Sequence, residues 1–163
     1  MELYLMQHGR AVPEEENPEQ PLSREGVAQI QATAAAMKRM GIAFDVIVCS
    51  PKKRSRQSAA LVAEGVNYPY SDIVETETVK ATAPPDEAVS FLRGFGREKR
   101  VLVAGHLPSL ARIASLLLGG DTSVRVRFEN GGLCRIDAAE LKPGEGELVF
   151  LIPAEQMKML AGK

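Results

Sequence analysis

Residues 1–10 have the sequence MELYLMQHGR, a short and mostly apolar run that ends in His8 and Gly9. A run of this kind is typical of a strand buried in a parallel sheet. In open α/β sheets, ligands bind outside the carboxyl ends of the strands, and a glycine there lets a backbone or ligand approach closely. We therefore predict a buried strand over residues 1–6, with His8 at the ligand-binding edge of a sheet.

The other histidine of the chain lies in the same kind of surroundings. A second apolar run, Val101–Gly105, is followed by His106 and then by a helical pattern from Pro108 to about Leu118. A single histidine after a strand is more often structural than catalytic. Because both histidines follow predicted strands, and carboxyl ends of parallel strands meet at one edge, a shared functional site is favoured.

A third predicted strand, Phe44–Cys49, leads into a group of basic residues. The segment that follows, SPKKRSRQS (residues 50–58), predicts a helix to about Glu64, with Ser50 as its N-cap and Pro51 at the first helical position. Free N–H groups and the helix dipole attract anions at such a position, and Arg54 with its basic neighbours adds to this attraction. The alternative interpretation is a solvated basic patch.

The remaining pattern alternates strands and helices and then becomes rich in strands. This order predicts a three-layer α/β/α fold with a central, mainly parallel sheet and an antiparallel element near the C-terminus, in one domain spanning residues 1–163.

An acidic segment, residues 10–21, is interpreted as a solvated loop or as a lip over an anion site. Further expected elements are a helix from Ser23, its N-cap, to Gly41, a short strand at 72–75, a helix from Pro84, a half-exposed strand at 124–128, a hairpin at Asn130–Gly132, strands at 133–136 and 148–152, and a terminal helix at 153–160.

Composition excludes several classes of partner. Lys and Arg total 20 and Asp and Glu total 21, so a net charge of -1 gives no general attraction to nucleic acid or to an anionic membrane. Cys49 and Cys134 are far apart in sequence and are interpreted as buried thiols of a reducing compartment. No signal-peptide pattern or spanning segment is present, so a cytoplasmic location is expected. Two histidines without carboxylates at ligand spacing make a poor metal site, and we expect no metal and no other cofactor.

Several segments resemble, in order and spacing, the motifs of the histidine phosphatase superfamily, the phosphoglycerate-mutase-like proteins. Residues 7–9 (QHG) are similar to the family's R-H-G, and residues 21–26 (PLSREG) to its P-L-T-x-x-G. Residues 50–59 are similar to S-P-x-x-R-A-x-Q-T-A, and residues 105–108 (GHLP) to the second-histidine motif in the form found in short SixA-type phosphohistidine phosphatases. The short chain without an inserted cap also resembles that branch.

The resemblance implies a metal-independent phosphatase that forms a phosphohistidine intermediate. His8 would be the nucleophile, Arg54 a phosphate ligand, and His106 a phosphate donor that stabilises the transition state. Ser50 at the helix start would bring backbone donors to the phosphate, and Gly9 would line the same site. The implied substrate is phosphohistidine in a protein, such as a histidine-phosphorylated signalling domain, or a small phosphoester.

Two departures from the family pattern bear on this interpretation. The family arginine before the nucleophile is Gln7 here, and Arg10 is a candidate to replace its charge. Larger relatives have a mid-chain acid, for which Glu77 is a loose match. Two alternatives therefore stay open: a phosphate- or phosphoprotein-binding module whose catalysis is weakened by Gln7, and, less favoured, a mutase.

Overall fold

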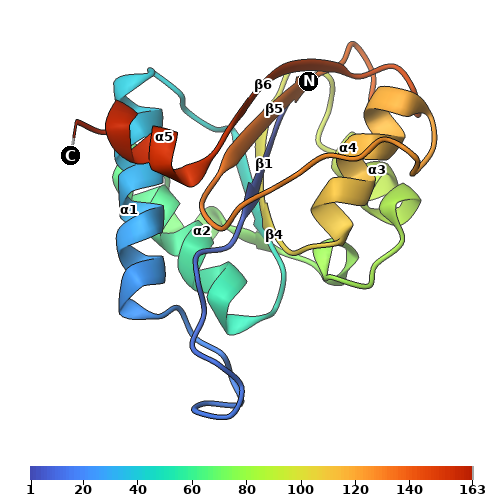
Figure 1. The fold of residues 1–163 in the computed structure, drawn as a ribbon. Coiled ribbons are helices and arrows are strands. Elements are labelled where there is room, and N and C mark those ends of the chain that lie inside the picture. Colours follow the sequence, from blue (N-terminus) through green and yellow to red (C-terminus); the bar gives the residue numbers. More distant parts are fainter. Residues whose placement is uncertain (163) are drawn as a thin grey trace.

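The computed structural model describes residues 1–162 and shows a central sheet with helices on both faces (Figure 1). The strand order is β3-β2-β4-β1-β5-β6. The pairs β2–β3, β2–β4 and β1–β4 are parallel, whereas β5 is antiparallel to β1 and β6 is antiparallel to β5. The predicted α/β/α fold and C-terminal antiparallel element are thus confirmed. The strands are β1 (Glu2–Gln7), β2 (Val46–Cys49), β3 (Val74–Glu75), β4 (Arg100–Gly105), β5 (Leu133–Asp137) and β6 (Glu147–Ile152).

The two faces of the sheet bury separate apolar cores, because successive side chains of a strand point to opposite faces. In β1, Leu3 and Leu5 belong to the core under α3 (Pro85–Arg93) and α4 (Ser109–Gly119). Tyr4 and Met6 belong to the other core. That core lies under three helices on the opposite face (Figure 1): α1 (Arg24–Arg39), α2 (Lys53–Val66) and α5 (Ala154–Leu160). Two short 3₁₀ helices, Tyr70–Asp72 and Glu77–Val79, flank β3.

The register of the central strands sets the position of both histidines. Gln7 at the end of β1 is paired with Gly105 at the end of β4, so His8 and His106 leave the sheet at the same level. The backbone N–H of His8 also donates to the carbonyl of Gly105 at 3.1 Å. The carboxyl end of β2 is beside that of β4, which brings Ser50 to the same edge.

The first helix begins as the sequence predicts. Ser23 is its N-cap, and its hydroxyl accepts a hydrogen bond from the N–H of Gly26 at 3.0 Å. Gly26 lies directly against the segment after β1: a Cβ on Gly9 would be 2.6 Å from the carbonyl oxygen of Gly26. Any side chain at Gly9 would therefore push α1 away from the residue that follows His8.

Two predicted elements near the C-terminus are wrong. Residues 124–128 do not form a strand. The position beside β1 is taken by β5, and the N–H of Val124 donates instead to the hydroxyl of Ser115 on α4. Asn130–Gly132 is consequently no hairpin between two strands; Asn130 forms an isolated bridge with Gln7 before β5 begins.

The predicted start of α2 is also wrong. The helix begins at Lys53 with Lys52 as N-cap, and Ser50 and Pro51 precede it. Ser50 is buried among the ends of β2 and β4, where its backbone N–H donates to the hydroxyl of Ser55 rather than entering the helix. The helix therefore starts later than the Ser-Pro signal indicates.

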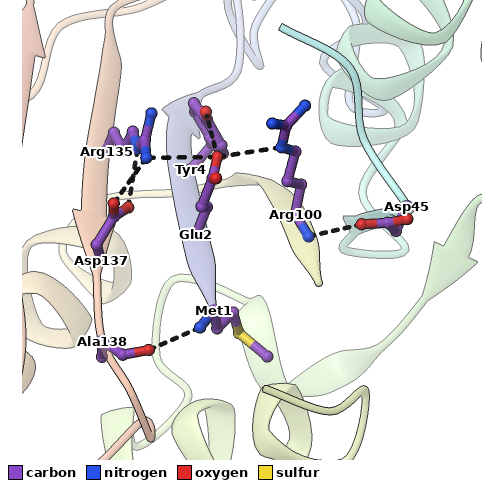
Figure 2. Close-up of polar contacts among 8 residues, drawn as sticks. All are labelled: Met1, Glu2, Tyr4, Asp45, Arg100, Arg135, Asp137 and Ala138. Atoms are coloured by element: carbon purple, nitrogen blue, oxygen red, sulfur yellow. Dashed lines mark hydrogen bonds and ion pairs between the residues drawn. The ribbon is translucent and has the colours of Figure 1, made fainter. Parts of the chain in front are cut away.

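The opposite edge of the sheet, at the amino end of β1, carries a network of ion pairs (Figure 2). Glu2 lies between Arg100, at 3.3 Å, and Arg135, at 3.5 Å, and Arg135 also pairs with Asp137 at 2.6 Å. This network joins β4, β1 and β5 at the edge remote from the histidines. Within residues 1–162, no helix is long and apolar enough to cross a membrane.

Candidate active site

The imidazole of His8 is held by the backbone of the next residue, Gly9, and one of its ring nitrogens is directed at Arg54. Its Nδ1 is 2.7 Å from the carbonyl oxygen of Gly9, an acceptor, so this nitrogen carries the proton of the neutral ring. Nε2 then has the lone pair, and it accepts a hydrogen bond from Nε of Arg54 at 3.1 Å. The nitrogen that can act as a nucleophile thus faces the cation that can hold an anion.

Arg54 lies in the first turn of α2 and is fixed from two sides. Besides its bond to His8, its Nη1 donates to the side-chain oxygen of Gln20 at 2.9 Å. The neighbouring Glu19 pairs with Lys53 at 2.6 Å. Residues 19 and 20 of the acidic segment therefore lie over the start of α2, and of the two interpretations of this segment the contacts favour the lip over an anion site.

His106 lies against Ser50 at the end of the neighbouring strand. Its Nε2 is 2.6 Å from the Ser50 hydroxyl, whereas its Nδ1 has no partner within residues 1–162. The side chain is almost completely buried, with 2 % of its surface exposed. Its ring centroid is 4.9 Å from that of His8, so the two imidazoles are adjacent.

Both imidazoles are neutral near pH 7. Burial lowers the pKa of His8 to about 4, and the charge of Arg54 adds to the shift while the bond to Gly9 opposes it. Burial also lowers the pKa of His106 to about 3, helped by the charges of His8, Arg54 and Lys52. A neutral imidazole has a free lone pair and is the form that attacks an electrophile.

Three other predicted site residues, Gln7, Arg10 and Glu77, have different surroundings. Gln7 ends β1, and its buried Oε1 has no hydrogen-bond partner in the described part of the chain. Arg10 is exposed and pairs with Glu25 at 2.9 Å. Within residues 1–162, its hydrogen bonds and ion pairs include none with the side chains of His8, Arg54 and His106. Glu77 pairs with Lys80 and has 70 % of its side chain exposed. The structure thus brings together His8, Arg54, His106 and Ser50, whereas it places Arg10 and Glu77 at the surface.

Three supporting residues were not predicted from the sequence. Gln20 bonds Arg54, as described, and Asn130 donates from its amide to the carbonyl of His8 at 2.8 Å. Ser58 accepts from the N–H of Gly9 at 3.1 Å and donates to the carbonyl of Arg54 at 2.7 Å. The only signal for Ser58 was its place in the S-P-x-x-R-A-x-Q-T-A-like segment; Gln20 and Asn130 lie in loops and gave none.

The N-terminal half of the chain matches a known family. Residues 3–78, which contain His8, Ser50 and Arg54, match the model of the histidine phosphatase superfamily (branch 1). This part of the chain is similar to that superfamily. An uncharacterized protein of Picosynechococcus sp. is 25 % identical over 162 residues, which cover 93 % of this chain and 95 % of that protein.

Solved structures of the superfamily share the fold over nearly the whole chain. The protein histidine phosphatase SixA in complex with tungstate matches with a TM-score of 0.86 at 21 % identity, covering 97 % of this chain and 100 % of SixA. SixA from Agrobacterium tumefaciens has a TM-score of 0.75 at 21 % identity, with 93 % and 96 % covered. The α-ribazole phosphatase of Shigella flexneri has 0.71 at 16 % identity, with 94 % and 97 % covered. These likenesses show that the chain shares the fold of these phosphatase structures.

Metal-ligating side chains do not gather in the described part of the chain. Within residues 1–162 there is no group of three or more His, Cys, Asp or Glu side chains that could hold a metal ion. Cys49 and Cys134 are both buried, and burial raises the pKa of Cys49 to about 11 and that of Cys134 to about 12. Both therefore stay protonated at neutral pH and are poor ligands and poor nucleophiles.

Proposed function

We propose that this protein is a metal-independent phosphatase that forms a phosphohistidine intermediate on His8, and that its substrate is phosphohistidine in a protein or a small phosphoester. One observation carries the proposal: a neutral His8 is fixed by Gly9 so that its Nε2 lone pair faces the Arg54 guanidinium at 3.1 Å. The site therefore pairs a nucleophile with an anion-binding cation.

In the first step, Nε2 of His8 forms a bond to phosphorus. The bond from phosphorus to the substrate's oxygen or nitrogen breaks, and the leaving group takes its electron pair and a proton from solvent water. Arg54 then holds the phosphoryl oxygens, on which charge is distributed in the transition state. The Nδ1–H bond to the Gly9 carbonyl stabilises the positive charge that the ring gains on phosphorylation.

In the second step, a water molecule attacks phosphorus and the bond to Nε2 breaks. His8 regains its lone pair, phosphate leaves with the water's oxygen, and the proton that this water loses passes to solvent. His106 lies next to His8. When the phosphoryl group enters, its oxygens replace the Ser50 hydroxyl as the partner of the His106 ring, and the ring then donates an N–H to them. SixA, whose fold this chain shares, has been solved in complex with tungstate, a tetrahedral oxyanion, and this supports an anion-binding function for the fold.

Gln7 favours a second candidate function, a phosphate-binding module with weak catalysis. The side chain is uncharged, and its buried oxygen lacks a partner. Arg10 does not supply the missing charge, because it pairs with Glu25. No specific observation favours the mutase alternative.

Trapping the intermediate separates the enzyme from the binding module. Incubation with ³²P-labelled phosphoramidate, followed by rapid denaturation in alkali, should yield a label on the wild-type chain that acid releases. His8→Ala should give no label and no turnover while far-UV circular dichroism stays unchanged. Lys158→Ala, a surface change on α5, is the matched control and should be labelled normally.

Inhibitors test the metal-free mechanism. Vanadate mimics five-coordinate phosphorus and should inhibit, whereas a chelator should leave the rate unchanged. A rate lost with the chelator and restored by a divalent ion would contradict the mechanism. A wild-type chain that binds vanadate but never becomes labelled would point to the binding module.

The pH profile of kcat/KM tests the state of the nucleophile. Because the pKa of His8 is lowered to about 4, the lone pair should persist well below the ordinary imidazole value of 6.5. We expect the rate to be kept down to about pH 5 and to fall with the protonation of His8 below it. A fall centred near 6.5 would show that the site does not depress this pKa.

A further inference from the structure

A hollow lies between α4 and the segment that precedes β5. It has a volume of about 330 Å³. Pro108, which lies within about 7 Å of His106 along the backbone, belongs to its wall. The floor and walls are Ala111, Val124 and Val126 together with Pro108, and the basic side chains around them are Arg112, Arg125 and Arg127.

The wall of this hollow is continuous with the catalytic edge of the sheet. The segment 121–130, orange in Figure 1, runs from the end of α4 to the end of β1. At its far end Asn130 bonds the carbonyl of His8, and the N–H of Gly131 donates to the carbonyl of Gln7 at 2.9 Å. The segment that forms one wall of the hollow therefore leads to His8, and α4, which forms the other wall, begins three residues after His106.

Most of the basic side chains on the side of α1 and α2 are paired, whereas two beside the hollow are not. Arg10, Lys53 and Arg56 each have a carboxylate partner. Lys52, the N-cap of α2, has none within residues 1–162. On the side of the hollow, Arg112 and Arg125 are exposed and take part in no ion pair within residues 1–162. Arg127 lies 3.7 Å from Glu129 with 89 % of its side chain exposed. Because no carboxylate offsets Arg112 or Arg125 within residues 1–162, these two guanidinium groups add no ion pair to the fold.

We propose that this hollow is a docking site for an acidic protein surface next to the phosphorylated residue of the substrate, a proposal that rests on the proposed phosphatase function. The guanidinium groups would pair with carboxylates, while Val124, which is 39 % exposed, would contact an apolar side chain. Contacts outside the phosphoryl pocket act on binding and encounter, and the proposal therefore concerns KM.

Two synthetic peptides test the docking site. Each has one phosphohistidine, made with phosphoramidate, and one leucine; the first has four glutamates around them, and the second has glutamines in their place. We expect the wild-type protein to prefer the glutamate peptide by about tenfold in kcat/KM at about 50 mM salt, mainly through KM. The preference should shrink to about threefold at about 200 mM salt, because the pairs are exposed.

The double variant Arg112→Gln/Arg125→Gln should bring the ratio of the two kcat/KM values close to one. The matched control, Arg97→Gln/Lys158→Gln, removes the same amount of charge at the remote sheet edge and on α5, and should keep the wild-type ratio. An unchanged ratio in the first variant, or an equal loss in both, would overturn the proposal. A second result would also overturn it: the wild-type protein prefers phosphoserine to a neutral phosphoester, and the first variant loses this preference. The hollow would then bind a small acidic substrate and not a protein surface.

A binding measurement keeps this test separate from catalysis. Fluorescent, unphosphorylated forms of the two peptides are titrated with two inactive proteins, and the fluorescence anisotropy is measured. The first protein is His8→Ala, and the second, a triple variant, adds Arg112→Gln and Arg125→Gln to it. Tighter binding of the glutamate peptide to His8→Ala, lost in the triple variant, would support the docking site even if no phosphatase activity were found. Equal binding of both peptides to His8→Ala would overturn it even if the phosphatase were active.

Discussion

Protonation of His106 gives the most quantitative prediction, because this side chain is only 2 % exposed. Its pKa is about 3 in the folded protein against 6.5 as an ordinary value. Between these two values the unfolded chain binds a proton that the folded chain does not. Folding stability therefore falls as the pH falls below 6.5, by up to about 1.4 kcal/mol per pH unit.

Integrated from about pH 8 to about pH 5, this difference removes about 2 kcal/mol of stability through His106 alone. His8, with a pKa of about 4, acts in the same direction. Carboxylates with lowered pKa values, such as those of Glu19 and Asp121, lose their contribution mainly below this window. The histidines should thus dominate the loss of stability above about pH 5.

The variant His106→Gln isolates the effect, because glutamine can keep a hydrogen bond to Ser50 but does not titrate. Urea unfolding followed by far-UV circular dichroism, at both pH values and constant ionic strength, gives the free energy of unfolding. We expect the wild-type protein to lose about 2 kcal/mol more than His106→Gln on acidification. The same loss in both proteins would refute the reasoning, because His106 would then titrate alike in the folded and unfolded chain.

The remaining predictions concern residues around His8. Gln7→Arg should raise kcat/KM by about tenfold, or about 1.4 kcal/mol, because it places a cation near developing phosphoryl charge; an unchanged rate and vanadate affinity would show that residue 7 does not touch the phosphoryl group. Arg10→Ala should change kcat/KM less than about twofold, because its guanidinium is paired at the surface, and a severe loss would reveal a role in the site. Ser58→Ala should cost about 1–3 kcal/mol in urea unfolding, since it leaves the N–H of Gly9 buried without a partner; a value near zero would show that water replaces the hydroxyl.

The convergence of His8, Arg54 and His106 could be predicted because it depends on short-range patterns. Each of the three follows an apolar strand, and parallel strands place their carboxyl ends at one edge. The contacts of Arg10 could not be predicted in this way. Only Gly9 separates it from His8, yet the direction of its side chain depends on where α1 begins and brings Glu25 into reach.

The failed strand at 124–128 shows a second limit of the sequence. The alternation of valine and arginine there fits a half-exposed strand as well as any in the chain. Whether it pairs depends on a free sheet edge, and β5 and β6 already fill that side of β1. The same alternation instead puts Val126 against the core and Arg125 and Arg127 in solvent. Periodicity indicates which side chains are buried but not which backbone supplies the hydrogen bonds.

The hydroxyl of Ser55 has a consequence for how the catalytic edge fluctuates. It accepts from the N–H of Ser50 at 2.9 Å and donates to the carbonyl of Ala104 at 2.6 Å, so one oxygen joins the ends of β2 and β4. Amide hydrogens at strand ends usually exchange with solvent through local fraying. The Ser50 amide can exchange only when its hydrogen bond to the buried Ser55 hydroxyl breaks. This opening also separates Ser50 from the ring of His106. Its exchange rate in deuterated water would therefore report how often the two halves of the catalytic edge come apart.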